Sequence, residues 1–579
     1  MSFLGVQKSL TNKYWSGPSD DALEKATLIS KELSVSLLSS LQLVKLNIKS
    51  EGYYKYINPK VKDLMPDPRN FLDLDKGAKR LLTAIEKKEK IALFADYDVD
   101  GTVSATLISL WLKNFSIEPT IYIPDREKEG FGPNVVAMKQ LANENSLIIC
   151  VDCGSDSDEA IREASRYKTD LIIIDHHRTE KIPRNAYAVI NPNRFDEKNP
   201  FSYLCAAGVV FIFLVRLTTL QKEKNDLRIN LLHYLDLVGL ATIADVVPLV
   251  GLNRAFVSQG LKIFKNRPCL NQLLKTHNLE NNLNEEKIAF QVAPRLNASG
   301  RLNTGLLTYQ FLMAEDPNII SDLIKKIEIL NLERKELEKI IFDAAVKKIV
   351  GDPETSTHIL SKSKNWHKGL IGIIAARLKE KYNKPAIVIT IDRENIGHGS
   401  IRSVEGIDLT LALSELKKKN ILISGGGHKM AAGFSIKANM MDNFNEIFSI
   451  CVKGQIERKI ESENLQLHGL INIDAINVDL INELYLLGPF GSQIPIPIIV
   501  VPNCRLVFSK IVGKTHIMCK FQRTGGNSLD AICFNASNNR LGEALLKKNI
   551  ELHVAGQLIV DEWQGITKPK IKIVDLAPC

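Results

Sequence analysis

Residues 91–101 read IALFADYDVDG, in which five apolar residues are followed directly by three alternating aspartates and a glycine. A short apolar run that ends in charged residues is typical of a strand buried in a parallel sheet. The aspartates then lie at the carboxyl end of that strand, which is the edge where open α/β sheets bind their ligands. The stretch therefore predicts an α/β fold with a charged site at one edge of its sheet.

Two more apolar runs end in the same way, in LIICVD at residues 147–152 and LIIIDHH at residues 171–177. A further candidate is Asp245, the lone carboxylate in LATIADVVP at residues 240–248. Carboxylates and imidazoles together suit Mn²⁺ or Mg²⁺ better than structural zinc. Two such ions would activate a water and stabilise the attacking and leaving oxygens of a phosphoryl transfer. If these side chains meet, the residues predict metal-dependent hydrolysis of a phosphoester.

The local geometry of the first motif follows from its spacing. Asp98 and Asp100 share a face if the strand extends through them, and Gly101 would let the backbone turn sharply into a helix that begins at Thr102. A single DxDxDG can also be a calcium loop or a solvated turn. This one follows a buried strand and lacks the closing glutamate of an EF-hand, so the pattern favours the edge site.

Composition narrows the class of protein. A chain of 579 residues with 45% hydrophobic residues and 24% charged residues is expected to form three or four globular domains. Its net charge of +9 fits a polyanionic partner without requiring one. The odd number of irregularly spaced cysteines, nine, indicates reduced thiols in the cytoplasm, and we interpret Cys150 and Cys153 as thiols flanking Asp152. No signal peptide is expected, and the longest apolar run, residues 204–215, predicts a buried helix and no membrane span.

The order of apolar runs predicts the organisation of the chain. Five strands, alternating with helices, are expected near residues 91–95, 119–123, 147–151, 171–174 and 187–190. Helices at 203–265 would cover this sheet, and a helix at 319–350 would connect to a second α/β unit at 356–455. Short strands at 465–473, 498–507, 516–521, 531–534, 552–559 and 571–574 predict a small β barrel.

The second α/β unit carries residues that suit phosphate. GSIRS at 399–403 and SGGGH at 424–428 combine glycines, whose amides can approach an anion, with Arg402 and His428. A glycine triplet alone is more often a tight turn. WHKG at 366–369 is equally compatible with an anion site at a helix start and with a helix cap that carries a packed tryptophan.

At these residues the chain resembles the DHH phosphoesterases and, among them, the bacterial RecJ exonucleases. The matching strings are DYDVDGT at 96–102, VDCG at 151–154, DHH at 175–177, LATIADVVPL at 240–249, APRLNASGR at 293–301, WHKGLIGIIAARL at 366–378, GSIRS at 399–403 and GGGHKMAAGF at 425–434, with YINPKVKDLMPDP at 56–68 upstream. The resemblance implies a two-metal nuclease that removes mononucleotides from the 5′ end of single-stranded DNA in recombination and repair.

The resemblance also assigns roles to residues of this chain. It implies Mn²⁺ or Mg²⁺ ligands, two ions in all, at Asp98, Asp100, Asp152, His176 and Asp245, with Asp96 as a ligand or the partner of one. It implies catalytic roles for Asp175, which would orient its neighbours, His177, which would contact the scissile phosphate or assist the leaving group, and Arg301, which would hold phosphate. It implies substrate contacts at Arg126, Ser400 and Arg402, which would bind the 5′ phosphate, and at Gly426, Gly427 and His428.

Three positions depart from the family pattern. Ala95 and Ile401 stand where glycine is common, and PFGSQIP at 489–495 lacks the Gly-Asn expected before its proline. The first two could tighten the backbone slightly. The third puts contacts beside the barrel in doubt, while the chemistry is unaffected.

The resemblance divides the chain into five parts. They are an N-terminal extension packing on the DHH lobe at 1–75, the DHH catalytic domain at 76–315, a connector helix at 316–350, a DHH-associated substrate-binding domain at 351–456 and an OB-fold nucleic-acid-binding domain at 457–579. The expected protein is a cytoplasmic bacterial monomer that acts on single-stranded DNA with a 5′ end. A single-strand-binding protein and a helicase are candidate partners.

Two other functions remain open at this stage. A phosphodiesterase for very short oligonucleotides or cyclic dinucleotides would need only the two lobes, so the barrel argues against it. A non-catalytic DNA-binding scaffold would not need the full set of ligands, which this chain retains.

Overall fold

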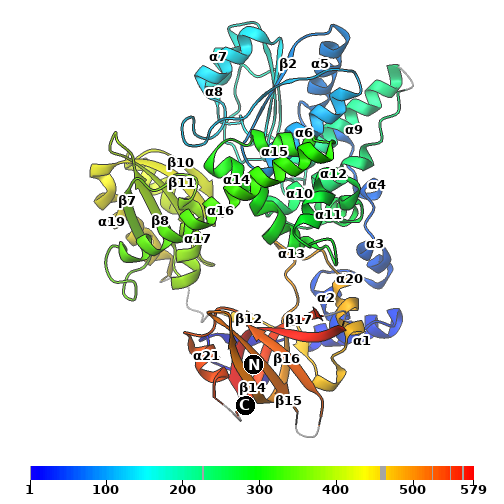
Figure 1. Cartoon of the computed structure of the whole chain (residues 1–579), viewed down its shortest axis with the longest axis vertical. Helices are drawn as coiled ribbons and strands as arrows, with labels where there is room; N and C mark the ends of the chain where they lie inside the picture. The colour runs from blue at the N-terminus through cyan, green and yellow to red at the C-terminus, as the bar shows by residue number, and fades with distance from the viewer. Residues whose placement is uncertain (1, 225–226, 457–463, 524–525, 548–549, 564–565) are drawn as a thin grey trace. The chain divides into compact units, whose positions relative to one another are not determined.

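The computed structural model describes residues 2–224, 227–456, 464–523, 526–547, 550–563 and 566–579 (Figure 1). The chain forms two compact units. Unit 1 comprises Met1–Leu64, Pro248–Ala255 and Glu461–Cys579, and unit 2 comprises Met65–Val247 and Phe256–Ile460.

Unit 2 begins with a five-stranded, all-parallel sheet in the order β3-β2-β4-β5-β6. Its strands are β2 (Ile91–Ala95), β3 (Thr120–Tyr122), β4 (Leu147–Val151), β5 (Asp170–Ile174) and β6 (Ala188–Ile190). Every residue of β2 and β4 is buried, as the near-continuous apolar runs require. The predicted parallel sheet is confirmed.

Helices cover both faces of this sheet (Figure 1). One face packs α7 (Val135–Glu144) and α8 (Asp158–Ser165) against alternate strand residues, among them Phe94, Ile148 and Ile173. The other face carries α5 (Leu74–Glu86), α6 (Val99–Lys113) and α9 (Ala206–Lys224). Two-sided burial explains why the strand sequences lack the alternation of polar and apolar residues.

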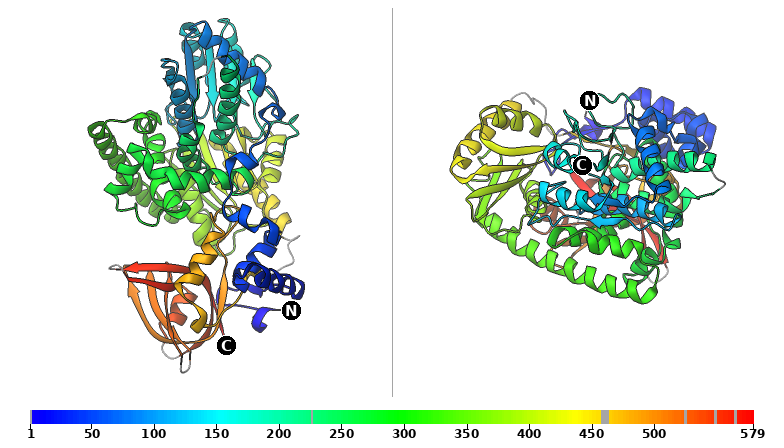
Figure 2. Two further views of the ribbon diagram at one scale, coloured as in Figure 1. Left: turned by 90° about the vertical axis from the view of Figure 1, so that its right-hand side faces the viewer. Right: turned by 90° about the horizontal axis from the view of Figure 1, so that it is seen from above.

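A helical layer follows, made of α10 (Leu235–Ala244), α11 (Gly251–Ile263), α12 (Pro268–Thr276), α13 (Glu285–Lys287), α14 (Ala293–Leu302) and α15 (Leu306–Met313). The first five residues of α11 belong to unit 1. The layer continues into α16 (Pro317–Lys347), a helix of 31 residues whose N-cap Asp316 accepts from two backbone N–H groups. At 1.5 Å per residue this helix is about 46 Å long. Figure 2 shows that it leads to the second sheet of unit 2.

The second sheet has the order β10-β11-β9-β8-β7, in which only β7 and β8 are parallel. Its strands are β7 (Ile359–Lys364), β8 (Ala386–Ile391), β9 (Ile396–Arg402), β10 (Leu422–His428) and β11 (Ala431–Lys437). The helices are α17 (Ile371–Tyr382), α18 (Leu409–Lys418) and α19 (Met441–Ile456). The expected second α/β unit is therefore present.

Unit 1 contains a closed barrel of five strands. The strands β14 (Ile499–Val512), β15 (His516–Gln522), β16 (Ser528–Cys533), β18 (Ile566–Pro578) and β17 (Glu551–Trp563) are neighbours in this order, and β17 pairs with β14. The short β13 (Gly469–Leu470) adds to β14, and α20 (Val478–Leu486) and α21 (Arg540–Leu545) accompany the barrel. Closure removes the exposed sheet edges. The predicted α/β fold with a C-terminal OB-type barrel is confirmed.

The N-terminal segment joins the barrel within unit 1. The strand β1 (Tyr14–Ser16) pairs with β12 (Asn464–Gln466), and α1 (Asp20–Leu33), α2 (Leu37–Lys45), α3 (Tyr53–Ile57) and α4 (Val61–Leu64) follow. Residues 65–75 belong to unit 2. The domain boundaries drawn from the sequence remain predictions, and the boundary at 456/457 touches residues 457–463, which lie outside the described residues.

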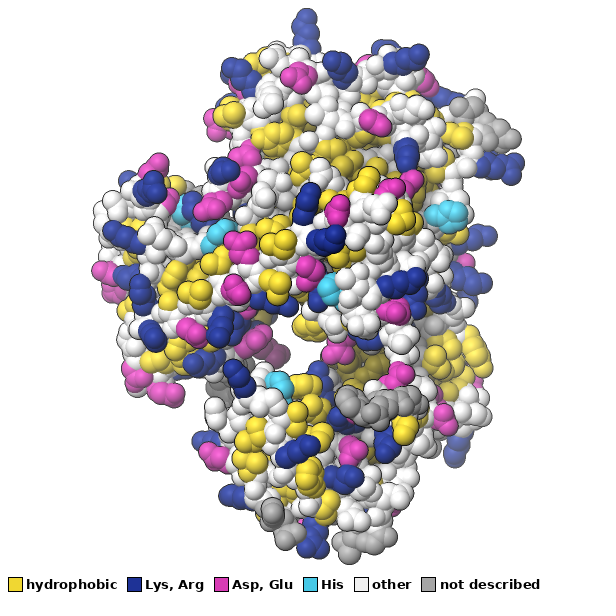
Figure 3. All heavy atoms as spheres, viewed as in Figure 1, with side chains coloured by type: hydrophobic (Ala, Val, Ile, Leu, Met, Phe, Trp, Pro, Cys, Tyr) yellow, Lys and Arg dark blue, Asp and Glu magenta, His cyan; other side chains and the backbone are white. Residues whose placement is uncertain are grey.

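Three features of the sequence, its apolar runs, its cysteines and its charge, can be followed in the structure. None of the described helices combines the length and apolar character that crossing a bilayer requires. Cys150 and Cys153 are fully buried free thiols, and the latter donates to the Val151 carbonyl. Basic and acidic side chains are interspersed on the face drawn in Figure 3, in keeping with the modest net charge.

A buried hydrogen bond ties the N-terminal strand to the barrel. Trp15 Nε1 donates to Asp575 Oδ2 at 2.8 Å, and both side chains are fully buried. We expect Trp15→Phe to lower the local free energy of opening of β17 and β18 by about 1–3 kcal/mol, because it leaves a buried carboxylate oxygen without its donor. Amide hydrogen exchange of these strands measures the loss. Trp111→Phe, which removes a similar indole bond in unit 2, is the control and should leave barrel exchange unchanged.

Candidate metal centre and phosphate pocket

The carboxyl edge of the parallel sheet positions three aspartates side by side. Asp96, Asp152 and Asp175 each follow a strand, and their N–H groups donate to the last carbonyls of β4, β5 and β6 at 3.3, 2.9 and 3.0 Å. The ladder of the sheet thus continues one residue beyond the strands and fixes the spacing of these residues. Asp152 adopts a left-handed φ of 60°, which aspartate tolerates better than most residues.

Side chains from distant parts of the sequence converge at this edge. Three groups each offer ligand atoms within 4.8 Å of one another: Asp96, Asp98 and Asp152; Asp100, His176 and Asp245; Asp152, His176 and His177. His176 is central, because its Nε2 lies 3.3 Å from Asp152, 3.6 Å from Asp245 and 3.8 Å from Asp100. The structure therefore brings together every residue expected to bind metal.

The local geometry of the first motif differs from the expectation. The strand ends at Ala95, and the helix α6 begins at Val99, not at Thr102. Asp98 is the N-cap, whose Oδ1 accepts from the N–H groups of Asp100 and Gly101 at 2.9 and 3.1 Å. The glycine makes no sharp turn; a Cβ there would lie 2.5 Å from the Asp96 carbonyl oxygen. The correction has a simple cause: capping competes with strand extension once Asp98 finds free N–H groups.

A helix start that the sequence did not reveal holds Asp100. Its Oδ2 and Oδ1 accept from the N–H groups of Ala206 and Ala207 at 2.7 and 2.9 Å, in the first turn of α9. The positive end of a helix favours a carboxylate at this point. The donors are backbone groups, so no side chain in the sequence signals the contact.

Asp175 orients the two histidines that follow it. Its Oδ1 accepts from the backbone N–H groups of His176 and His177 and from His177 Nδ1, the last at 2.8 Å, while Oδ2 accepts from Ser155 N. Burial would raise the pKa of Asp175, but His177 more than offsets it, and the pKa lies below its ordinary value. A carboxylate with this many donors is suited to orienting its neighbours.

Two asparagines that the sequence analysis did not single out support the same histidines. Asn191 Nδ2 donates to the His177 carbonyl at 2.8 Å, and Asn193 Nδ2 donates to the His176 carbonyl at 2.7 Å. Both closely follow β6, a strand that the sequence did predict. Polar residues that directly follow a predicted strand are candidates for the site, and this criterion would have identified both asparagines.

Asp245 reaches the cluster from the end of α10, where it is the C-cap. The next residue, Val246, has a φ of 58° and is largely exposed. A β-branched residue rarely adopts this conformation, so the backbone is strained beside the site. The left-handed conformation of Val246 ends the helix directly after Asp245, whose carboxylate lies 3.6 Å from His176 Nε2.

The electrostatics of the cluster favour a cation. Burial and neighbouring carboxylates raise the pKa values of Asp96, Asp152 and Asp245, and they raise that of Asp100 to about 7. Burial and His177 lower the pKa of His176 to about 4, so its imidazole is neutral, as a metal ligand must be. Asp96 Oδ1 and Asp152 Oδ1 are buried without a hydrogen-bond partner. Buried oxygens in this state fit a bound cation.

His177 differs from its neighbour in protonation. Burial lowers the pKa of His177, but Asp175 and nearby carboxylates outweigh it and raise the pKa to about 10. Phe131 packs its exposed ring against the imidazole, with centroids 5.4 Å apart.

Arginines gather beside the carboxylates. Burial lowers the pKa of Arg301 to about 10 and also lowers that of Arg402, and Arg126 is the next cause for both. Arg126 also lies over the ring of Tyr97, 5.0 Å from its centroid. Arg301 Nη1 donates to the Gly369 carbonyl at 3.3 Å. Arginines that are near enough to lower one another's pKa are suited to an anion.

The start of α17 faces Ser400 and Arg402, which project from the same side of β9. Arg402 Nη1 donates to Ser400 Oγ at 2.9 Å. A Cβ on Gly372 would lie 3.0 Å from Arg402 Nη2 and 3.3 Å from Ser400 Oγ, so only glycine leaves this space open.

The residues of the glycine triplet lie on β10, an edge strand of the second sheet, not in a tight turn. A Cβ on Gly427 would lie 2.4 Å from the Ala431 carbonyl oxygen, whereas Gly426 faces open space. Burial lowers the pKa of His428, and the positive charges of His177 and Arg178 lower it further. His428 is therefore close enough to the carboxylate and histidine cluster to be affected by its charges.

Three family models match the chain in order. Residues 90–242 match the DHH family, N-terminal domain; residues 355–454 match the DHHA1 domain; residues 467–575 match the RecJ OB domain. The clustered carboxylates and these domains define a DHH phosphoesterase, a metal-dependent hydrolase.

Relatives identify the family more closely. The chain is 32% identical to the single-stranded-DNA-specific exonuclease RecJ of Bacillus subtilis over 96% of this chain and 70% of that one, and 29% identical to its Escherichia coli counterpart over 87% and 90%. The chain belongs to the RecJ family of exonucleases.

Solved structures show the same fold. RecJ of Thermus thermophilus in complex with Mn²⁺ matches with a TM-score of 0.79 at 24% identity, covering 97% of this chain and 79% of that one. A structure of exonuclease RecJ bound to manganese matches with a TM-score of 0.56 at 28% identity, covering 67% and 96%.

Removing the support for the histidine backbone should weaken metal binding. We expect Asn193→Ala to lower the affinity for Mn²⁺ about tenfold, because the His176 carbonyl loses its donor and the ring loses its orientation. Calorimetric titration with Mn²⁺ measures the effect. Asn145→Ala is the matched control, since this buried amide also donates to a carbonyl but precedes β4 at the opposite edge of the sheet. Equal Mn²⁺ affinities for Asn193→Ala and Asn145→Ala would show that the hydrogen bond from Asn193 does not orient His176 for metal binding.

Proposed function

We propose that this protein degrades single-stranded DNA to mononucleotides from the 5′ end, in recombination and repair. The observation that carries the proposal is the meeting of the carboxylate and histidine cluster with the arginine group formed by Arg126, Arg301 and Arg402. The cluster is suited to the hydrolysis of a phosphodiester, and the arginines are suited to binding the phosphate groups beside it. Membership in a family of single-stranded-DNA-specific exonucleases supports the substrate.

Two Mn²⁺ or Mg²⁺ ions would be held at the sheet edge. The groups Asp96, Asp98, Asp152 and Asp100, His176, Asp245 share no member, which supports one ion for each. Oxygen and imidazole ligands without cysteine suit these metals. When bound, such ions supply the charge that activates water and stabilises the reacting phosphate.

The surrounding residues orient the reaction. Asp175 accepts a hydrogen bond from His177 Nδ1, which leaves Nε2 to contact the scissile phosphate or the leaving oxygen. Arg301, buried and charged, would hold a nonbridging phosphate oxygen. Both groups are fixed before substrate arrives, so little reorganisation is needed at the moment of reaction.

The polarity would come from a pocket for the terminal phosphate. Ser400, Arg402 and Arg126 supply a hydroxyl and two guanidinium groups, and the first turn of α17 adds a positive helix end. A 5′ phosphate held here would place the first internucleotide linkage at the metal cluster. Gly426, Gly427 and His428 would contact the strand beyond it.

The barrel offers a track for a longer strand. On its outer face, four residues form a row of register partners across neighbouring strands, in the order Lys510, Met518, Ile532 and Lys572. Phe534 is exposed at the end of β16, with His516 against its edge and Lys572 Nζ 5.7 Å from its centroid. Aromatic rings among lysines are suited to stacked bases and their phosphates. A monomer could act in this way, and a single-strand-binding protein and a helicase would supply its substrate.

This track favours the exonuclease over the short-oligonucleotide phosphodiesterase, because a dinucleotide cannot reach an extended surface. Faster cleavage of a trimer than of a long single strand would reverse this preference. A non-catalytic scaffold is disfavoured by the two oxygens that lack hydrogen-bond partners in the cluster. DNA binding without turnover in Mn²⁺ would favour the non-catalytic scaffold instead.

The main test is release of mononucleotides from a 5′-phosphorylated oligonucleotide in Mn²⁺. We expect Asp98→Asn to lower the rate about a thousandfold, because the helix cap survives while a metal ligand loses its charge. Chelation with EDTA should abolish activity, and added Mn²⁺ should restore it. Asp316→Asn is the matched control, since this residue also caps a helix through the N–H groups two and three positions on. Products released only from the 3′ end would refute the proposed polarity.

The phosphate pocket makes a separate prediction. We expect Gly372→Ala to reduce the preference for a 5′ phosphate over a 5′ hydroxyl about tenfold, because the new methyl displaces Arg402 or Ser400. The ratio of kcat/KM values for the two oligonucleotides measures it. Gly454→Ala, in a helix with open space around the glycine, should leave the ratio unchanged. An unchanged ratio in Gly372→Ala would place the terminal phosphate elsewhere.

A further inference from the structure

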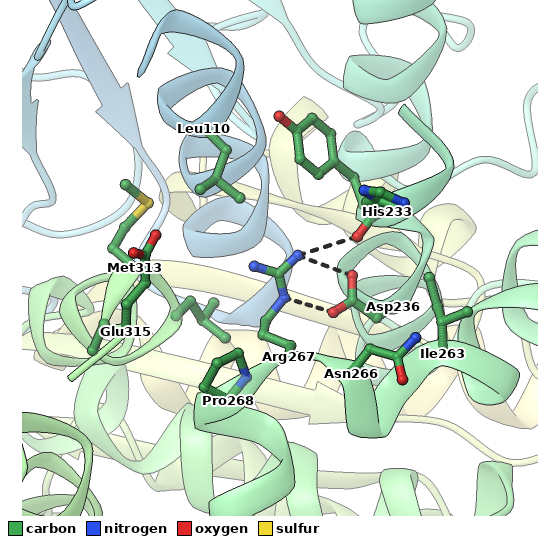
Figure 4. Close-up of a pocket in the computed structure, with 12 residues that line it drawn as sticks. Leu110, His233, Asp236, Ile263, Asn266, Arg267, Pro268, Met313 and Glu315 are labelled. Atoms are coloured by element: carbon green, nitrogen blue, oxygen red, sulfur yellow. Dashed lines mark hydrogen bonds and ion pairs between the residues drawn. The ribbon is translucent and has the colours of Figure 1, made fainter. Parts of the chain in front are cut away.

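A cavity of about 600 Å³ lies among the helices of unit 2, apart from the metal cluster. Its walls come from the last turns of α6, α11 and α15 and from the first turns of α10 and α12 (Figure 4). Binding sites for small organic molecules have volumes in this range.

Two helices separate the cavity from the metal cluster. α6 begins beside Asp98 and contributes Leu110 to the cavity near its other end. α10 ends at Asp245 and contributes Asp236 from its first turn. At 1.5 Å per residue, each pair of positions is about 14 Å or more apart along its helix. A molecule in the cavity would therefore not touch DNA at the metals.

One charged side chain in the cavity is fixed with part of its binding capacity unused. Arg267 Nε and Nη2 donate to the two oxygens of Asp236, and Nη2 also lies 3.4 Å from the His233 carbonyl oxygen. The side chain of Asp236 is 2% exposed and that of Arg267 is 14% exposed, so the pair is held inside the protein. No hydrogen bond of Nη1 is found among the described residues, and Figure 4 shows this nitrogen pointing away from Asp236, toward the side of the cavity where Met313 and Glu315 lie.

The rest of the cavity is mostly apolar. Leu110, Leu312, Met313 and Pro268 form its walls around the arginine. Glu315 also borders it; its side chain is 70% exposed and pairs with Lys113 at 2.8 Å, and Arg267 adds a smaller positive influence on its carboxylate. An occupant thus meets apolar walls, the polar side chains of His233, Tyr234 and Asn266, and one preoriented cationic donor that is paired with Asp236.

We propose that this cavity binds a small carboxylate with an apolar body. The carboxylate would accept from Arg267 Nη1, because a charge-assisted hydrogen bond is about twice as strong as a neutral one. The apolar part would fill the space between Leu110 and Met313. The site is independent of the exonuclease activity, and the cation is already oriented, so binding has little ordering cost.

The probe is 4-phenylbutyrate, titrated into the full-length protein and followed by calorimetry. We expect saturable binding with a dissociation constant of about 1 mM, as befits a ligand of this size. The alcohol 4-phenyl-1-butanol has the same body without the carboxylate and should bind at least about tenfold more weakly.

Two variants locate the site. Arg267→Lys keeps a cation for Asp236 but removes Nη1, and Ala314→Phe fills the cavity while leaving the ion pair intact. Each should weaken binding at least about tenfold. Arg166→Lys alters the ion pair between the exposed Arg166, the C-cap of α8, and Glu163; it is the matched control and should bind as the unaltered protein does. Unchanged exonuclease rates in all three show that they are folded.

Three results would each overturn the proposal. They are absence of binding at a concentration about twentyfold above the expected constant, equal binding of the acid and the alcohol, and unaltered binding in both Arg267→Lys and Ala314→Phe.

Discussion

The architecture of the catalytic lobe depends on holding several carboxylates together where they repel one another. At 4 Å and an effective dielectric of about 20, each pair of unit charges costs about 4 kcal/mol. The sheet edge, the N-cap at Asp98 and the helix start at Ala206 keep these groups in place with backbone donors. Cations would relieve this repulsion, so the cluster is suited to hold them.

Unit 2 also places positive charge against this negative cluster. The arginines at 126, 301 and 402 come from a loop, from α14 and from the second sheet, and burial with mutual repulsion lowers the pKa values of the last two. A phosphodiester needs both kinds of charge, cations at its reacting oxygens and fixed donors at the others. The two lobes of unit 2 supply them from distant parts of the sequence.

The sequence predicted the parts that follow from local patterns. Apolar runs located the strands of the first sheet within one or two residues, and the charges that end them predicted which side chains gather at its carboxyl edge. The same pattern extends to β6, where Asn191 and Asn193 follow the strand and donate to the carbonyls of the two histidines. The prediction failed at Gly101, because a choice between strand and helix cap depends on which donors are free, and periodicity does not record this.

By itself, the sequence determined which residues carry charge at strand ends, and hence the class of site that this chain can form. The tertiary structure alone decided that Asp100 rests on the start of α9, that Asp245 meets His176, and that the N-terminal strand joins the barrel through Trp15. These contacts join residues more than 60 positions apart through backbone donors or buried side chains. Such pairs have no common period in the sequence, so only the packing of the elements brings them together.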